Sequence, residues 1–286
     1  MIYTKISPKI IDSEIQKRIE NILESGLKDL SQIEAYKIIL SVIDLTTLEG
    51  SDTNGKIIGV CKKAQDFKNK GIGIPNVAAV CFYPPFMKIA KENLINTDIK
   101  VASVAGAFPS GQSPLEVRIA EVKYAVENGA DEIDIVISRG KFLEGDFQYV
   151  YDEIAALKKV CGNLHLKVIL ETGELGSLLN IRKASDIAID AGADFIKTST
   201  GKISPAATLE AFIVMLDAIK EHYEKTGKMV GIKPAGGISE PEDTIEFLTV
   251  LQAVLGEKWM NKNFFRIGAS RLADKILGKI VKLLNF

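Results

Sequence analysis

DFIKTSTGK, residues 194–202, is a short apolar segment that carries one lysine and then runs into a glycine turn. VGIKPAGG, residues 230–237, repeats this arrangement further along the chain. Both segments begin with the apolar residues that favour strands and end with residues that favour turns. A charged amine in the middle of a buried strand is costly. Two such strands therefore predict a functional site inside the fold.

Six further apolar runs extend this pattern and indicate eight strands altogether. The runs are VIDLT (42–46), VAAVCFY (77–83), VASVAG (101–106), EIDIVI (132–137), HLKVIL (165–170) and FFRIGA (264–269). Most steps between strands are about 30 residues, the length of one strand and its crossover helix. The intervening segments, such as SPLEVRIAEVKYAVENGA, have apolar residues at helical spacing and a glycine where the helix should end. Eight such units predict an α/β protein with a (β/α)8 TIM barrel. A doubly wound sheet is the alternative, but no GxGxxG opens the first helix.

Residues 1–40 precede the first strand and predict an N-terminal helical extension to a barrel domain over residues 41–286. Ser13 is a candidate N-cap for a first helix that Gly26 would end, and a second helix is expected to follow. We expect this extension to pack on the barrel or on a partner subunit.

Composition argues against several classes of protein. The 286 residues are 47% hydrophobic and 26% charged with a net charge of −1, which indicates a large core and little disorder. Basic residues are spread evenly, which argues against a nucleic-acid surface. No apolar run has the roughly 18 residues needed to span a bilayer, and the N-terminus does not resemble a signal peptide. Three isolated cysteines argue against disulfides and zinc, so we expect a soluble cytoplasmic enzyme. The two histidines leave little scope for histidine chemistry.

Strand periodicity places four charged side chains inside the predicted barrel. Because strand side chains alternate faces, Asp134, Lys167, Lys197 and Lys233 lie opposite the apolar residues that would meet the helices. One aspartate among three lysines leaves an excess of positive charge. Desolvation and repulsion between amines lower a lysine pKa, and a neutral lysine can form a Schiff base with a carbonyl. The pattern predicts amine chemistry but leaves open which lysine is the nucleophile, and a structural ion-pair network is the alternative. Two more charged residues, Glu171 and Arg266, are interpreted as structural supports.

Three neighbouring strand ends have the composition of a phosphate site. TIM barrels bind ligands at the C-terminal ends of their strands, and phosphate sites favour the loops after strands 7 and 8. Glycines let backbone N–H groups approach an anion, while a lysine or a helix N-terminus adds positive charge. The residues are Thr200, Gly201 and Lys202 after the sixth strand, Gly236 and Gly237 after the seventh, and Ser270 after the eighth. The pattern predicts a phosphorylated ligand.

Taken together, these motifs resemble the deoxyribose-phosphate aldolase family. They are DLTTL (44–48), CFYP (81–84), GADEIDIV (129–136), LKVILETGEL (166–175), KASDIAIDAGADFIKTSTGK (183–202), KPAGG (233–237) and FRIGAS (265–270). FIKTSTGK together with KPAGG is the most specific part of the resemblance. The resemblance implies a class I, Schiff-base aldolase that needs no metal or other cofactor. Such an enzyme interconverts 2-deoxy-D-ribose 5-phosphate with D-glyceraldehyde 3-phosphate and acetaldehyde.

The resemblance also implies roles for individual residues. Lys197 would form the imine, Lys233 would lie beside it and lower its pKa, and Asp134 would work with Lys233 in proton transfer. Asp44, Thr46 and Cys81 would line the sugar-hydroxyl region, and Gly201, Lys202, Gly236, Gly237 and Ser270 would hold the phosphate. Lys167 and Thr200 complete the expected substrate-binding set.

Two positions depart from the family pattern. Ser239 stands where many members have an arginine after the glycine pair, and Arg271 stands where many have a small polar residue after GAS. We therefore expect Arg271 to replace the usual phosphate-loop arginine. The alternatives are another Schiff-base barrel lyase or transaldolase, or a non-catalytic barrel that binds sugar phosphates. We expect a homo-oligomer, either a dimer or a tetramer, with small-molecule ligands and neither nucleic-acid nor membrane partners.

Overall fold

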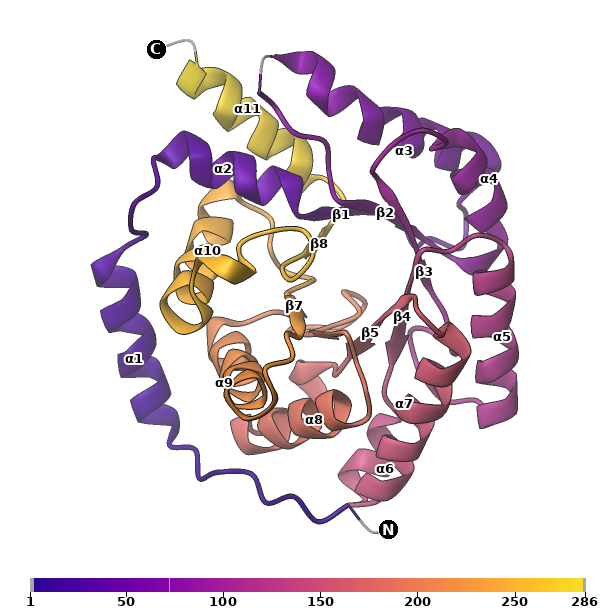
Figure 1. The fold of residues 1–286 in the computed structure, drawn as a ribbon, viewed down its shortest axis with the longest axis vertical. Coiled ribbons are helices and arrows are strands. Elements are labelled where there is room, and N and C mark those ends of the chain that lie inside the picture. Colours follow the sequence, from indigo (N-terminus) through magenta and orange to yellow (C-terminus); the bar gives the residue numbers. More distant parts are fainter. Residues whose placement is uncertain (1–2, 72, 285–286) are drawn as a thin grey trace.

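The computed structural model describes residues 3–71 and 73–284, and its centre is a ring of eight parallel strands (Figure 1). The strands are β1 (Ile43–Thr46), β2 (Ala79–Phe82), β3 (Lys100–Val104), β4 (Glu132–Val136), β5 (His165–Ile169), β6 (Phe195–Lys197), β7 (Gly231–Lys233) and β8 (Ile267–Ala269). Ladders join them in the order β7-β6-β5-β4-β3-β2-β1-β8. Parallel bridges from Ile232 to Phe265 and from Ala235 to Gly268 bring the two ends of this sheet together. The predicted TIM barrel is confirmed.

The helices surround the strands as an outer layer (Figure 1). They are α3 (Asn54–Asp66), α4 (Met87–Asn93), α5 (Leu115–Glu127), α6 (Arg139–Leu143), α7 (Phe147–Cys161), α8 (Leu178–Asp190), α9 (Leu209–Thr226), α10 (Pro241–Leu255) and α11 (Leu272–Leu284). Thr53, Ser177 and Thr208 begin α3, α8 and α9 by accepting a backbone N–H at their side-chain oxygens. Within the described ranges, no helix combines the length and the apolar character that crossing a membrane requires.

The strands bury their apolar faces against these helices, as side-chain alternation predicts. Ile133 of β4 and Val168 of β5 belong to the main hydrophobic core. Asp134 and Lys167 point the other way, into the barrel, where they pair at 2.9 Å. β6 and β7 have three residues each, so they are shorter than the predicted strands FIKTST (195–200) and VGIKPA (230–235). Beyond them the two segments stay joined through Thr198, whose backbone N–H donates to the Lys233 carbonyl at 3.1 Å.

The N-terminal extension lies across the outside of the barrel. α1 (Asp12–Ser25) packs against α9 and α10, and α2 (Gln32–Ser41) packs against α10 and α11 (Figure 1). Ile15 and Ile19 of α1 belong to the same hydrophobic core as the barrel. Of the two expected partners for this extension, the structure shows the barrel.

The first helix begins differently from the prediction. Ser13 is not its N-cap: α1 begins at Asp12, two residues before the predicted start, with Ile11 in the capping position and no side-chain cap bond. The acidic side chains of the first turn, from Asp12 and Glu14, interact favourably with the helix dipole there. Gly26 ends the helix as predicted, with φ of 65°, a conformation that glycine adopts without strain.

Candidate active site

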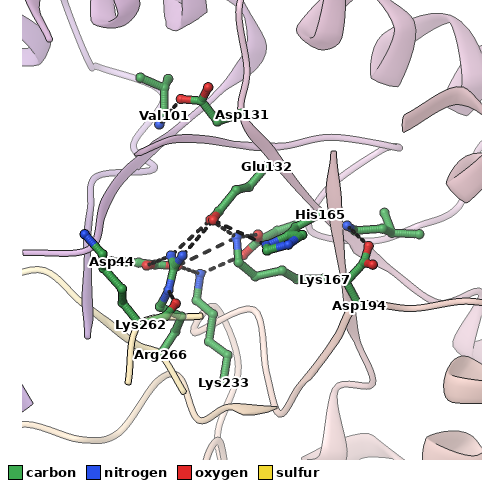
Figure 2. Close-up of polar contacts among 12 residues, drawn as sticks. Asp44, Val101, Asp131, Glu132, His165, Lys167, Asp194, Lys233, Lys262 and Arg266 are labelled. Carbon is green, nitrogen blue, oxygen red and sulfur yellow. Dashed lines mark hydrogen bonds and ion pairs between the residues drawn. The ribbon is translucent and has the colours of Figure 1, made fainter. Parts of the chain in front are cut away.

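Seven charged side chains meet inside the barrel, and we call them the interior charge network. They are Asp44 from β1, Glu132 and Asp134 from β4, Lys167 from β5, Lys197 from β6, Lys233 from β7, and Arg266 just before β8. None is more than 3% exposed. Figure 2 shows the side chains of Asp44, Glu132, Lys167, Lys233 and Arg266 pointing toward one another. Four cations thus meet three carboxylates, which leaves a smaller positive excess than one aspartate among three lysines would give.

Glu132 anchors one end of this network. Its carboxylate accepts from Lys167 Nζ at 2.6 Å and from the two terminal nitrogens of Arg266 at 2.6 and 3.0 Å. Arg266 also donates to Asp44 Oδ1 at 2.7 Å. Burial opposes ionisation of Glu132, but Lys167 and Arg266 outweigh it and hold the pKa of this carboxyl well below its usual range. Arg266 is therefore a support inside the barrel, as predicted.

Asp134 is shared by three lysines at the other end of the network. Its Oδ2 accepts from Lys197 Nζ and from Lys233 Nζ, both at 2.8 Å, and its Oδ1 accepts from Lys167 Nζ. Burial alone would raise the pKa of this carboxyl, but the three ammonium groups hold it well below the usual value. Asp134 is therefore an ionised acceptor in contact with two neighbouring amines.

Lys197 and Lys233 are both buried but differ in their partners. Burial lowers the pKa of Lys197, and the charge of Lys233 lowers it further against the attraction of Asp134. Burial also opposes the charge of Lys233, but Asp134 and Asp44 outweigh it and raise the pKa of this lysine. Lys233 Nζ donates to Asp44 Oδ2 at 2.5 Å in addition to its bond with Asp134. Lys197 is therefore the amine that loses its proton more easily.

A cleft of about 610 Å³ opens at the C-terminal ends of the strands. Its lining includes Thr46, Lys197, Thr200, Gly201, Lys202, Gly236, Gly237, Ser270 and Arg271. Among the described residues, Lys197 is the one member of the interior charge network that lines this cleft. Lys167 and Lys233, by contrast, have no exposed surface. Access to the cleft thus distinguishes Lys197 from Lys167 and Lys233, which strand periodicity alone could not do.

The glycine turns after β6 and β7 are packed against each other at one side of the cleft. Gly236 has φ of 77°, and a Cβ at this position would lie 2.8 Å from the Ala206 Cβ and 2.9 Å from the Gly201 Cα. A side chain would therefore have to push the two loops apart. The close approach keeps the backbone of both turns at the surface of the cleft, where backbone N–H groups can meet an anion.

The Glu171 side chain stabilises the loop after β6 through hydrogen bonds to Thr200. Its buried carboxylate accepts from the Thr200 backbone N–H at 3.1 Å and from the Thr200 hydroxyl at 2.5 Å. The same hydroxyl oxygen accepts from the Lys202 backbone N–H at 3.1 Å. Glu171 itself has φ of 57°, an uncommon conformation for a residue other than glycine. Glu171 is thus a support, as its sequence position suggested, and acts through Thr200.

The structure brings most, but not all, of the expected substrate-binding residues to the cleft. Asp44 and Lys167 are held by ion pairs within the interior charge network. Cys81 is buried in a small apolar cluster with Val104 and Phe108, and burial raises the pKa of its thiol to about 11. The other expected substrate-binding residues line the cleft, and so does Arg271.

One member of the network, Glu132, was missed from the sequence. It lies two residues before Asp134 on β4, so the alternation that turns Asp134 inward also turns Glu132 inward. The signal was present in the strand EIDIVI, where Glu132 and Asp134 stand two residues apart.

Comparisons with known proteins identify similar chains. A family model described as DeoC/LacD family aldolase matches residues 38–258. Deoxyribose-phosphate aldolase from Homo sapiens is 46% identical over 250 residues, covering 83% of this chain and 78% of the relative. The Bos taurus deoxyribose-phosphate aldolase is 48% identical over 250 residues, with the same coverage of each chain. A deoxyribose phosphate aldolase from Aeropyrum pernix, whose solved structure is described as a unique tetramer, has a TM-score of 0.69 and 26% identity. That match covers 92% of this chain and 98% of the other.

Proposed function

The chain belongs to the DeoC/LacD family of aldolases, and we propose that it cleaves 2-deoxy-D-ribose 5-phosphate reversibly to D-glyceraldehyde 3-phosphate and acetaldehyde. The observation that carries this proposal is the position of Lys197. It is a buried amine with a lowered pKa that lines a cleft at the C-terminal ends of the strands. A neutral amine in such a cleft can attack an aldehyde, and the human and bovine relatives are named deoxyribose-phosphate aldolases.

Imine formation is the first step. The neutral Nζ of Lys197 attacks C1 of the open-chain sugar, and the resulting carbinolamine loses water to give a protonated imine. The departing hydroxyl needs a proton, and the neighbouring Asp134–Lys233 pair, with water, supplies it. Asp134 is suited to this role because its Oδ2 lies 2.8 Å from both amines.

Carbon–carbon cleavage follows from the imine, which acts as an electron sink. The C3 hydroxyl gives up its proton and becomes the aldehyde of glyceraldehyde 3-phosphate. The electrons of the C2–C3 bond form the C1–C2 double bond of an enamine on Lys197. Reprotonation at C2 and hydrolysis of the imine then release acetaldehyde and restore the amine. Asp134, Lys233 and water carry these protons as well.

The cleft offers a place for each part of the substrate. The phosphate lies against the turns after β6, β7 and β8, with Gly201, Lys202, Gly236, Gly237 and Ser270 as its partners. Arg271, which lines the cleft, adds the guanidinium that the loop after β7 lacks. Thr46 faces the sugar. Asp44, Cys81 and Lys167 lie deeper in the barrel, where they fix the charge and shape of its interior.

We also propose a domain organisation, a cellular environment and an oligomeric state for this protein. Residues 41–286 form the catalytic barrel and residues 1–40 its extension. The three cysteines are free and buried, in keeping with a reducing cytoplasmic environment. We propose a homo-oligomer because the Aeropyrum pernix relative is described as a tetramer. The ligands are a sugar phosphate and small aldehydes, without nucleic-acid or membrane partners.

Reductive trapping tests the central assignment. Acetaldehyde and borohydride should leave a stable ethyl adduct on Lys197 alone, identified by digestion and mass spectrometry. Lys197→Leu should remain folded, form no adduct and lose turnover of deoxyribose 5-phosphate. Residual turnover above about one hundredth of the wild-type rate would contradict the role of Lys197 as nucleophile. An adduct on another barrel lysine would assign the nucleophile to that lysine instead. The absence of any adduct would favour a non-catalytic barrel.

A further inference from the structure

Glu49 and Lys202 form an ion pair at the cleft that the proposed mechanism does not use. Lys202 Nζ donates to Glu49 Oε1 at 3.0 Å, and both residues line the cleft. Glu49 follows β1 and Lys202 follows β6. β7 and β8 lie between these two strands in the closed ring, and their loops carry Gly236 and Arg271. The pair therefore links the two loops that flank the proposed phosphate site.

Both partners stand on loops that buried carboxylates hold in place. The Glu49 backbone N–H donates to Asp52 at 3.0 Å, and the Thr47 hydroxyl donates to the same carboxylate. The Asp52 side chain is 1% exposed. On the other side, Thr200 connects the Lys202 backbone to Glu171. These bonds fix the two loops in the positions where Glu49 meets Lys202, which distinguishes this pair from a chance surface contact.

We infer that Glu49 occupies Lys202 in the absence of substrate, and that the phosphate of a bound substrate displaces it. This inference rests on the proposed function, because it adds an internal competitor to the same site. An exposed ion pair is weak, and the Glu49 side chain is 61% exposed. A phosphate dianion brings a second charge and also meets the backbone N–H groups of the glycine turns. Glu49 thus lowers the affinity of the site for anions, a cost that an unphosphorylated sugar does not meet.

Anion binding and turnover together test this role. In Glu49→Gln we expect the Kd for inorganic phosphate, measured by calorimetry, to fall by about two- to fivefold, the range for loss of an exposed pair. The KM for deoxyribose 5-phosphate should fall relative to that for unphosphorylated 2-deoxyribose. Arg271→Ala should shift both quantities in the opposite direction. Glu144→Gln is the matched control, because Glu144 pairs with Lys141 at 3.1 Å and does not line the cleft.

The outcomes separate this inference from the proposed function. Unchanged or weaker phosphate binding in Glu49→Gln would overturn the inference, as would an equal change in KM for both sugars. A wild-type protein that binds phosphate but turns over neither sugar would contradict the proposed function. Tighter phosphate binding in Glu49→Gln would still support displacement in that case, because calorimetry needs no turnover.

Discussion

Lys197 and Lys233 share Asp134 but differ in their other partners, and this difference sets the chemistry of each amine. Lys197 and Lys233 both lie 2.8 Å from the same oxygen, yet their pKa values move in opposite directions. The difference comes from Asp44, which contacts Lys233 as well. A second carboxylate stabilises the ammonium form of Lys233, and the charge of Lys233 adds to the effect of burial in lowering the pKa of Lys197.

Removing the charge of Lys233 should therefore raise the pKa of Lys197. In Lys233→Met, Asp134 attracts Lys197 without the opposing cation, so the ammonium form of Lys197 persists to higher pH. The pH at which acetaldehyde trapping by cyanoborohydride reaches half its maximal rate should move upward. The buried carboxylates keep partners, since Asp44 retains Arg266 at 2.7 Å and Asp134 retains Lys167.

Trapping is the appropriate measurement here because the midpoint of its pH profile reports the ionisation of Lys197. Loss of proton transfer by Lys233 during imine formation would lower the maximal trapping rate rather than move this midpoint. Lys141→Met, at an exposed ion pair, controls for the loss of one positive charge. A midpoint that stays fixed or moves downward in Lys233→Met would show that Lys233 does not tune Lys197.

Strand register explains why the sequence could predict the four inward charges but not their depth. Alternation gives the face of each side chain, whereas depth depends on how neighbouring strands are aligned. Lys167 is in register with Phe195, and Lys197 is in register with Ile169. Lys197 therefore stands two residues, or about 7 Å, nearer the C-terminal end of the barrel than Lys167. Lys233 is level with Lys197. These offsets arise from closure of the barrel, which no single strand encodes.

At the scale of elements, the loops are less regular than the strands and carry more of the proposed binding site. The eight strands lie where apolar runs predicted them, because burial on both faces requires continuous apolar segments. β6 and β7 stop early, since the segments beyond them turn toward the cleft and bond through side chains. The contact between Thr200 and Glu171 is such a bond, and it joins two loops far apart in sequence.

The Thr200 hydroxyl should be necessary for the shape of the loop after β6. Thr200→Val removes the donor to Glu171 and the acceptor for the Lys202 backbone, so a buried carboxylate loses a partner and the loop loses its support. We expect a loss of about 1–3 kcal/mol in unfolding free energy and a larger effect on KM for the phosphorylated sugar than on kcat. Chemical denaturation and steady-state kinetics measure these changes.

Thr200→Ser is the matched variant, because it keeps the hydroxyl and should restore both stability and KM. If Thr200→Ser behaved like Thr200→Val, the methyl group rather than the hydroxyl bond would be responsible. If neither variant altered KM, the loop would not depend on this bond.

Across the whole molecule, the N-terminal extension binds the outer helices together. Arg18 of α1 makes a bidentate pair with Asp217 of α9 at 2.7 and 2.9 Å. Before α1, the Tyr3 hydroxyl donates to Asp190 at the end of α8. In Figure 1 this segment runs along the outside of α8 and α9, on the periphery of the barrel. The extension is placed to stabilise the barrel without contacting the interior lysines.

Truncation of one buried side chain in α1 tests this role. Ile19 is 6% exposed within the common core, so Ile19→Ala should lower the free energy of unfolding by about 2–4 kcal/mol. Ile6, in the same extension, is 91% exposed, and Ile6→Ala should change stability by less than about 0.5 kcal/mol. Because α1 shares its core with the barrel, unfolding of Ile19→Ala should remain a single transition, and acetaldehyde trapping on Lys197 should be retained. An additional early transition in urea, with the barrel unchanged in stability, would instead show that the extension unfolds as a separate unit.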